Sequence, residues 1–409
     1  RSPRAIMTST FSDELAIHYG KDSKIFAVSV KDRGAVSMGG HAGKAFWFSK
    51  KAGQFITSKF YYETYPYWTA KWNARRLPFA YAGKSWELLR DKESYRNAEL
   101  DDMPYETNLP GFGRVFPHPY GPDDGKLFTT LLTTSPAGDE LTVSFAKELI
   151  EGEKLGQDDV PDYLSVSLSS TDYVGHLFGP SSLESEDQIL RLDRQIADLL
   201  SFVDERIGID KTLIVLSADH GAADPPGYLE RYGIPATYIN PKEWDTTPGL
   251  SRLKERFGIG KELIKSYFHP YIYLDEEAIA KSGASQAEVE REVANEVMKL
   301  PGVALAVSST ALATGAYADM PLMRSILKNF SPSRSGDVFV VFAPHSFIND
   351  FDGLTVAAHH GSPWNYDTYV PMIFAGNGLD GRRVARRVET VDLAPTLAAL
   401  LGTKPPSGS

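Results

Sequence analysis

The chain has 409 residues, of which 42% are hydrophobic and 23% charged, a composition typical of a globular protein with a substantial core. Its formal net charge of −10 argues against a nucleic-acid-binding protein, which would need a basic surface. Cysteine is absent, which excludes disulfides, thiolate zinc sites and a cysteine nucleophile, and no apolar run is long enough to cross a membrane.

Five short apolar runs, each bounded by turn-forming residues, predict buried strands. They cover residues 24–30, 163–168, 212–216, 338–342 and 371–374. Apolar residues recur at helical spacing over residues 184–206, 286–300 and 392–401. This alternation predicts an α/β fold, an α/β/α sandwich around a mostly parallel sheet. Residues 60–124 and 228–337 fit the alternation poorly, and we expect two insertions that cap one domain spanning residues 1–409.

The first predicted strand leads into two cations, Lys31 and Arg33. Residues two apart face the same side of an extended segment, so these side chains are expected side by side. A lysine ammonium beside an arginine fork can bind the non-bridging oxygens of a phosphate group. Taken alone, two solvated charges at a strand end are the commoner explanation.

A carboxylate and a histidine, Asp172 and His176, follow the second predicted strand at a spacing of four residues. A loop that runs into the start of a helix would direct both side chains to one cation. An isolated pair at this spacing is common by chance, with the aspartate as a helix cap and the histidine as a surface residue.

Two further turns contain histidine. Asp219 and His220 directly follow the third predicted strand and precede Gly221, which permits the bent backbone that adjacent ligands of one ion require. An ordinary turn at a strand end fits the same residues. Near the C-terminus, His360 stands directly before a glycine, as His220 does, and we prefer it as a ligand over His359.

Three such histidine turns in a chain with nine histidines are improbable as a coincidence. Active-site groups in open α/β sheets gather at the carboxyl ends of strands, where the first two turns are expected. We therefore predict a shared two-metal site of Asp172, His176, Asp219, His220 and His360. Three nitrogen and two oxygen donors favour zinc, and paired metals of this kind act on phosphate esters.

The order D-x-x-G-H, A-D-H-G and H-G resembles the alkaline phosphatase superfamily with its two zinc ions, over most of the chain. The segment V-S-x-K-D-R at residues 28–33 resembles its phosphate-irrepressible, PafA-type members, which are similar to type I phosphodiesterases and nucleotide pyrophosphatases. The resemblance implies one zinc ion on Asp172, His176 and His360. It implies a second ion on Asp219 and His220, with Lys31 and Arg33 contacting the transferred phosphoryl group.

The family's nucleophile, a Thr or Ser at a helix N-terminus, has no match in this pattern, and neither has a further metal-binding Asp. Thr8, Ser9 and Thr10 have suitable hydroxyls, but acids soon after Thr10 predict a helix N-cap there. We therefore expect the nucleophile to lie upstream of residue 1 and this piece, taken alone, to be inactive.

The resemblance implies zinc-dependent hydrolysis of small phosphate monoesters through a covalent phospho-Thr or phospho-Ser intermediate. The two extra cations favour monoesters, because a dianionic monoester has more charge to neutralise than a diester. A phosphodiesterase or nucleotide pyrophosphatase of the same superfamily is the alternative, and a non-catalytic metal-binding relative is a third possibility. The resemblance also implies a periplasmic or secreted enzyme.

Overall fold

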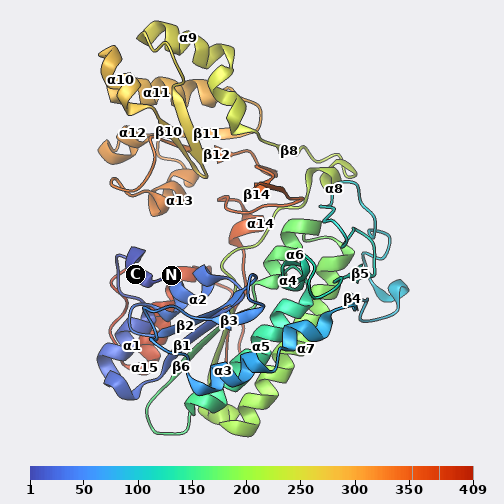
Figure 1. Ribbon diagram of the computed structural model, residues 1–409. Coiled ribbons are helices and arrows are strands. Elements are labelled where there is room, and N and C mark those ends of the chain that lie inside the picture. Colours follow the sequence, from blue (N-terminus) through green and yellow to red (C-terminus); the bar gives the residue numbers. More distant parts are fainter. Residues whose placement is uncertain (352, 377, 409) are drawn as a thin grey trace. The chain divides into compact units, whose positions relative to one another are not determined.

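The computed structural model describes residues 1–351, 353–376 and 378–408 (Figure 1). The chain forms two compact units. Unit 1 comprises Arg1–Met103, Thr107–Asp219 and the chain from Pro371 on, and unit 2 comprises Pro104–Glu106 and His220–Val370. Whether these parts make one capped domain, as the sequence predicts, stays a prediction.

The elements of unit 1 are mostly those of an alternating α/β chain. Its helices are α1 (Phe11–Tyr19), α2 (Asp32–Gly39), α3 (Tyr67–Ala74), α4 (Phe128–Thr133), α5 (Pro136–Glu153), α6 (Ser170–Phe178), α7 (Leu183–Arg206) and α15 (Leu393–Leu401). Its strands are β1 (Ile25–Ser29), β2 (Lys44–Ser49), β3 (Gln54–Ile56), β4 (Ser85–Trp86), β5 (His118–Pro119), β6 (Tyr163–Ser167), β7 (Leu213–Ser217) and β16 (Met372–Gly376). Among the described helices, none is both long and apolar enough to cross a membrane.

The central sheet of unit 1 has the strand order β3-β2-β1-β6. β1 runs parallel to both β2 and β6, and β3 is antiparallel to β2. Alternate residues of β2 serve opposite faces: Phe46 packs with Phe145 of α5, whereas Trp47 packs with Val36 of α2. Helices therefore cover both faces, with α2 on one side of the sheet and α5 on the other (Figure 1). The predicted α/β/α sandwich with a mostly parallel sheet is confirmed.

The last two strands of unit 1 form a separate ribbon. β7 pairs with β16 in antiparallel register, with Ser217 opposite Met372. Leu213 and Val215 of β7 contact the same apolar cluster as Tyr163 of β6. The sequence predicted both segments as strands but not their antiparallel pairing, because an apolar run does not indicate strand direction.

Unit 2 has its own sheet. Its strands are β8 (Thr237–Tyr238), β9 (Ile264–Phe268), β10 (Tyr271–Leu274), β11 (Val303–Ser308), β12 (Val338–Phe342), β13 (Ser346–Phe347), β14 (Asp350–Phe351) and β15 (Leu354–Thr355). Its helices are α8 (Pro226–Glu230), α9 (Pro248–Phe257), α10 (Glu276–Ser282), α11 (Gln286–Val297), α12 (Ser309–Thr314), α13 (Pro321–Asn329) and α14 (Asn365–Thr368). The antiparallel order β11-β12-β10-β9 assigns the predicted strand at 338–342 to this sheet and not to the parallel one.

Both faces of the unit 2 sheet are also covered. On one face Val340 of β12 packs with Val289 and Val293 of α11, which confirms the helix predicted from its valine spacing. On the other face Val341 packs with Ile326 of α13. Unit 2 therefore has an apolar core of its own, distinct from the clusters of unit 1.

Candidate active site

The carboxyl ends of β1 and β6 bring two predicted site residues together in unit 1. Lys31 follows β1, and Asp172 lies in the first turn of α6, which begins soon after β6. The Lys31 ammonium forms an ion pair with the Asp172 carboxylate, and both side chains are mostly buried. The same ammonium lies 4.3 Å from the centre of the Tyr173 ring. Parallel pairing of β1 with β6 explains this meeting of residues far apart in sequence.

Asp172 and His176 lie one turn apart on α6. The distance between Asp172 Oδ1 and His176 Nε2 is 3.4 Å, so both ligand atoms can be offered to one ion. His176 lies inside a helix and not in one of the three predicted histidine turns, because α6 continues through Gly175 and ends at Gly179. Gly179 has φ of +94°, a conformation that favours glycine at a helix end.

The start of α6 is held by a carboxylate from another helix. Ser169 makes no side-chain cap, and Asp139 of α5 instead accepts the backbone N–H groups of Ser170 at 3.0 Å and Thr171 at 3.2 Å. The Gln188 amide of α7 donates to the same carboxylate at 3.0 Å. Burial raises the pKa of Asp139 to about 6, although these hydrogen bonds act in the opposite direction. Sequence analysis missed this residue, because one acid inside a helix forms no motif.

Arg33 does not extend the strand as predicted. The chain leaves β1 at Ser29, Lys31 is the extended N-cap residue of α2 (φ −96°, ψ 128°), and Arg33 already belongs to that helix. The argument that residues two apart share one side of a strand is therefore wrong here. Arg33 is exposed, yet its charge acts on a further lysine of unit 1.

That lysine, Lys50, directly follows β2. Its ammonium lies 4.7 Å from the centre of the Tyr173 ring, which Lys31 also approaches. Residue 50 is exposed as a whole, but burial around its ammonium lowers the pKa of Lys50, and the charges of Lys31 and Arg33 lower it further. Sequence analysis did not predict β2, so nothing placed Lys50 at this edge of the sheet.

In unit 2, the predicted ligands His220 and His360 stack with ring centres 3.4 Å apart and planes inclined by 10°. His220 Nδ1 lies 2.8 Å from the carbonyl of Gly221. Donation to that carbonyl puts the imidazole proton on Nδ1, so Nε2 is the unprotonated nitrogen, the form that binds a metal. A Cβ on Gly221 would lie 2.0 Å from the Tyr366 carbonyl oxygen, so glycine is needed here for close packing. Asp219, which ends the second segment of unit 1, precedes this turn.

A buried carboxylate joins the two histidine turns of unit 2. The Asp367 side chain accepts the N–H of Ser362 at 2.7 Å and its hydroxyl at 2.6 Å, while the Asp367 carbonyl accepts the N–H of Gly221 at 2.7 Å. Burial raises the pKa of Asp367, with Ser362 and His220 acting against that rise. His359, the alternative ligand, accepts the N–H of His360 at its Nδ1.

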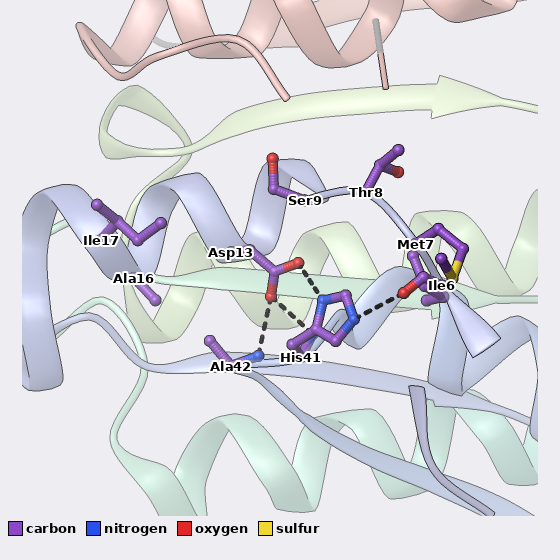
Figure 2. A pocket seen from close by; sticks show the side chains of 9 residues that line it. All are labelled: Ile6, Met7, Thr8, Ser9, Asp13, Ala16, Ile17, His41 and Ala42. Atoms are coloured by element: carbon purple, nitrogen blue, oxygen red, sulfur yellow. Dashed lines mark hydrogen bonds and ion pairs between the residues drawn. The ribbon is translucent and has the colours of Figure 1, made fainter. Parts of the chain in front are cut away.

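The three N-terminal hydroxyls considered above as nucleophiles also belong to unit 1. Thr8 and Ser9 line a shallow hollow of about 540 Å³ (Figure 2). Its wall is fixed by Asp13, whose carboxylate lies 2.8 Å from His41 Nδ1, and the Asp13 hydrogen bond raises the pKa of His41. Thr10 and Asp13 form a reciprocal capping box at the start of α1, which confirms the predicted cap. None of the predicted site residues lines this hollow.

Comparison with known proteins places this geometry in context. A model of the type I phosphodiesterase / nucleotide pyrophosphatase family matches residues 10–363. The chain is 34% identical over 411 residues to alkaline phosphatase PhoV of Synechococcus elongatus, covering all of this chain and 72% of that protein. It is 32% identical over 417 residues to alkaline phosphatase PafA of Elizabethkingia meningoseptica, covering all of this chain and 74% of that protein. The crystal structure of wild-type PafA matches with a TM-score of 0.88 at 30% identity, covering 100% of this chain and 77% of that one.

Proposed function

Because the chain belongs to the type I phosphodiesterase / nucleotide pyrophosphatase family, as one of its PafA-like alkaline phosphatases, we propose that it hydrolyses phosphate monoesters. The observation that carries this proposal is the meeting of Lys31, Asp172 and His176 at the carboxyl edge of the unit 1 sheet. The cation that we propose for the phosphate oxygens therefore lies directly beside candidate metal ligands. We include a small-molecule substrate and a periplasmic or secreted location in the same proposal.

Two zinc ions are part of the proposal. Asp172, His176 and His360 would hold one ion, and Asp219 and His220 the other. The donor chemistry suits zinc, because three imidazole nitrogens and two carboxylates are ligands that it accepts, and a proton on His220 Nδ1 would leave Nε2 in the unprotonated form that binds a metal. Zinc bound there would lower the pKa of an attacking hydroxyl and neutralise the leaving oxygen.

The protein's own cations would bind the phosphoryl group. Lys31, anchored between Asp172 and the Tyr173 ring, is oriented before substrate arrives and would stabilise the equatorial oxygens of the transition state. Arg33, exposed in the first turn of α2, would supply the second set of donors. We propose a phospho-Thr or phospho-Ser intermediate for the reaction.

A substrate pair tests the function. In the full-length protein supplied with zinc, we expect kcat/KM for an aryl phosphate to exceed that for its methyl diester. Lys31→Ala and Arg33→Ala should each lower monoester turnover roughly 100-fold or more, as loss of a transition-state donor does, with a much smaller effect on the diester. Lys59→Ala, which removes an exposed charge elsewhere in unit 1, is the matched control.

The outcomes separate the alternatives. Equal losses on both substrates would contradict the phosphoryl role of Lys31 and Arg33, and faster diester turnover would favour a phosphodiesterase or nucleotide pyrophosphatase. The measured metal content tests for a non-catalytic metal-binding relative, which would bind two equivalents of zinc without turnover of either ester. His220→Ala and His360→Ala should each reduce the bound zinc.

A further inference from the structure

Three parallel strands converge on Tyr173. β2, β1 and β6 are neighbours in the sheet and run in the same direction, so their carboxyl ends share one edge. Lys50 follows β2, Lys31 follows β1, and Tyr173 belongs to the helix after β6. The two ammonium groups lie 4.7 Å and 4.3 Å from the centre of the Tyr173 ring. Two cations therefore share one aromatic ring.

The charges at this edge are not balanced. Lys31 is paired with Asp172, whereas Lys50 forms no ion pair with any carboxylate of the described chain. The charges that act on Lys50 are those of Lys31 and Arg33, both cationic. The face of Tyr173 attracts a cation but supplies no net charge. An anion bound beside Lys50 would relieve this repulsion.

The position of Lys50 suggests which anion. Lys31 touches Asp172, a candidate metal ligand, while Lys50 stands one strand further from β6, and adjacent strands are roughly 4.8 Å apart. A phosphoryl group held by Lys31 would thus leave Lys50 facing the neighbouring part of the same substrate. Lys50 comes from a different strand from the pair proposed to bind the phosphoryl oxygens.

We propose that Lys50 binds a second anionic group of the substrate, so that the preferred substrates are phosphate esters whose organic part bears a carboxylate or another phosphate. This inference rests on the proposed function, since it places the phosphoryl group at Lys31 and Arg33. Lys50 acts as a specificity-determining residue and takes no part in bond breaking.

The test compares two substrates that differ by one carboxylate, phenyl phosphate and 3-carboxyphenyl phosphate, in the full-length protein. We expect the wild type to prefer the carboxylated ester. Lys50→Met should lower that preference, the ratio of the two kcat/KM values, about fivefold and mainly through KM, the size of effect typical of a partly exposed ion pair. Lys50→Arg should keep the preference, and Lys51→Met, a loss of the adjacent exposed charge, should leave it unchanged.

An unchanged ratio in Lys50→Met would overturn the inference, as would an equal loss in Lys51→Met. Calorimetry of inorganic phosphate and pyrophosphate separates this failure from failure of the proposed function, because it needs no turnover. Lys50→Met should weaken pyrophosphate binding about fivefold more than phosphate binding. If the wild type hydrolyses neither ester but Lys50→Met weakens pyrophosphate binding selectively, the proposed function is rejected and the anion subsite is retained. If the substitution changes the binding of neither anion, the subsite is rejected.

Discussion

His118 and Glu184 form a fully buried pair in unit 1, with 3.2 Å between His118 Nε2 and Glu184 Oε1. His118 Nδ1 lies 3.2 Å from the Phe112 carbonyl, to which only an N–H can donate. In the neutral imidazole Nε2 is then the acceptor, and the protonated form of Glu184 donates to it. Burial explains both states, because it raises the pKa of Glu184 well above its ordinary value and lowers the pKa of His118 to about 4.

This pair predicts an acid-sensitive contribution to stability. The folded pKa of His118 is depressed, so between pH 6.5 and about 4 the unfolded chain binds more protons and the free energy of unfolding falls as the pH falls. Glu184 acts in the opposite sense, because its folded pKa is raised. Its contribution to the free energy of unfolding is lost as the pH rises through that pKa. Glu184→Gln removes this second titration and keeps an N–H donor for Nε2.

In the Glu184→Gln background we expect the His118 contribution to fall by about 3 kcal/mol from pH 7 to pH 4. Urea denaturation of Glu184→Gln and of the double variant Glu184→Gln/His118→Gln at the two pH values separates the His118 contribution from those of other titrating groups. The same pH dependence in both variants would show that His118 is not the group responsible.

Local patterns predicted some residues of the site and not others. The cap at Thr10 and the pairing of Asp172 with His176 follow from neighbours in the sequence, and both were predictable. Lys50 contacts Tyr173, and Asp367 accepts a hydrogen bond from Gly221; only the tertiary fold brings these partners near. No sequence spacing encodes such meetings.

At the scale of elements, α6 depends on α5 for its start. Asp139 gives α6 the N-terminal acceptor that Ser169 does not provide, and it does so one residue before the candidate ligand Asp172. A helix N-terminus concentrates unpaired N–H groups, and removal of a buried acceptor leaves them unsatisfied. The position of the candidate ligands on α6 therefore depends on a side chain from outside the helix.

Asp139→Ala should lower the free energy of unfolding by about 3 kcal/mol and weaken zinc binding. Asp139→Asn should lower the free energy of unfolding and the zinc affinity less than Asp139→Ala does, since its carbonyl oxygen can still accept from Ser170 or Thr171. Chelator competition measures the zinc affinity, and Asp123→Asn, an exposed loop change, serves as control. Unaltered zinc affinity in Asp139→Ala would limit its role to general stability.

The sequence predicted the fully buried strands well, but it did not predict the sheet to which each strand belongs. β1 and β12 are buried along their whole length and were found as apolar runs. The sequence could not assign them to different sheets, one parallel and one antiparallel, because both environments select the same residues. β2 was missed, although its Phe46 and Trp47 lie in the core.

At the scale of the whole chain, unit 2 is a nearly continuous segment, His220–Val370, joined by three residues from elsewhere. The flanking strands β7 and β16 are already paired, with Ser217 opposite Met372. The two ends of the segment therefore leave and return at neighbouring positions of one antiparallel ribbon. Such a pair can be closed by two residues.

Replacement of residues 218–371 by an Asn-Gly turn should leave a unit 1 that still unfolds cooperatively, because its core clusters lie within it. Circular dichroism during urea denaturation would show this. A variant with the turn joined one residue out of register is the control, and it should be less stable because the shift reverses which side chains face the core. A non-cooperative transition in the in-register variant would show that unit 1 does not fold independently.

The ribbon of β7 and β16 has a consequence for how such proteins diversify. A segment that begins and ends at one hairpin can be gained, lost or exchanged without rerouting the remaining chain. His220 and His360 belong to this exchangeable segment, whereas Lys31, Lys50 and Asp172 belong to unit 1. A recombinant that carries a relative's segment would therefore replace the candidate histidine ligands as a set and keep the cations proposed to bind the substrate.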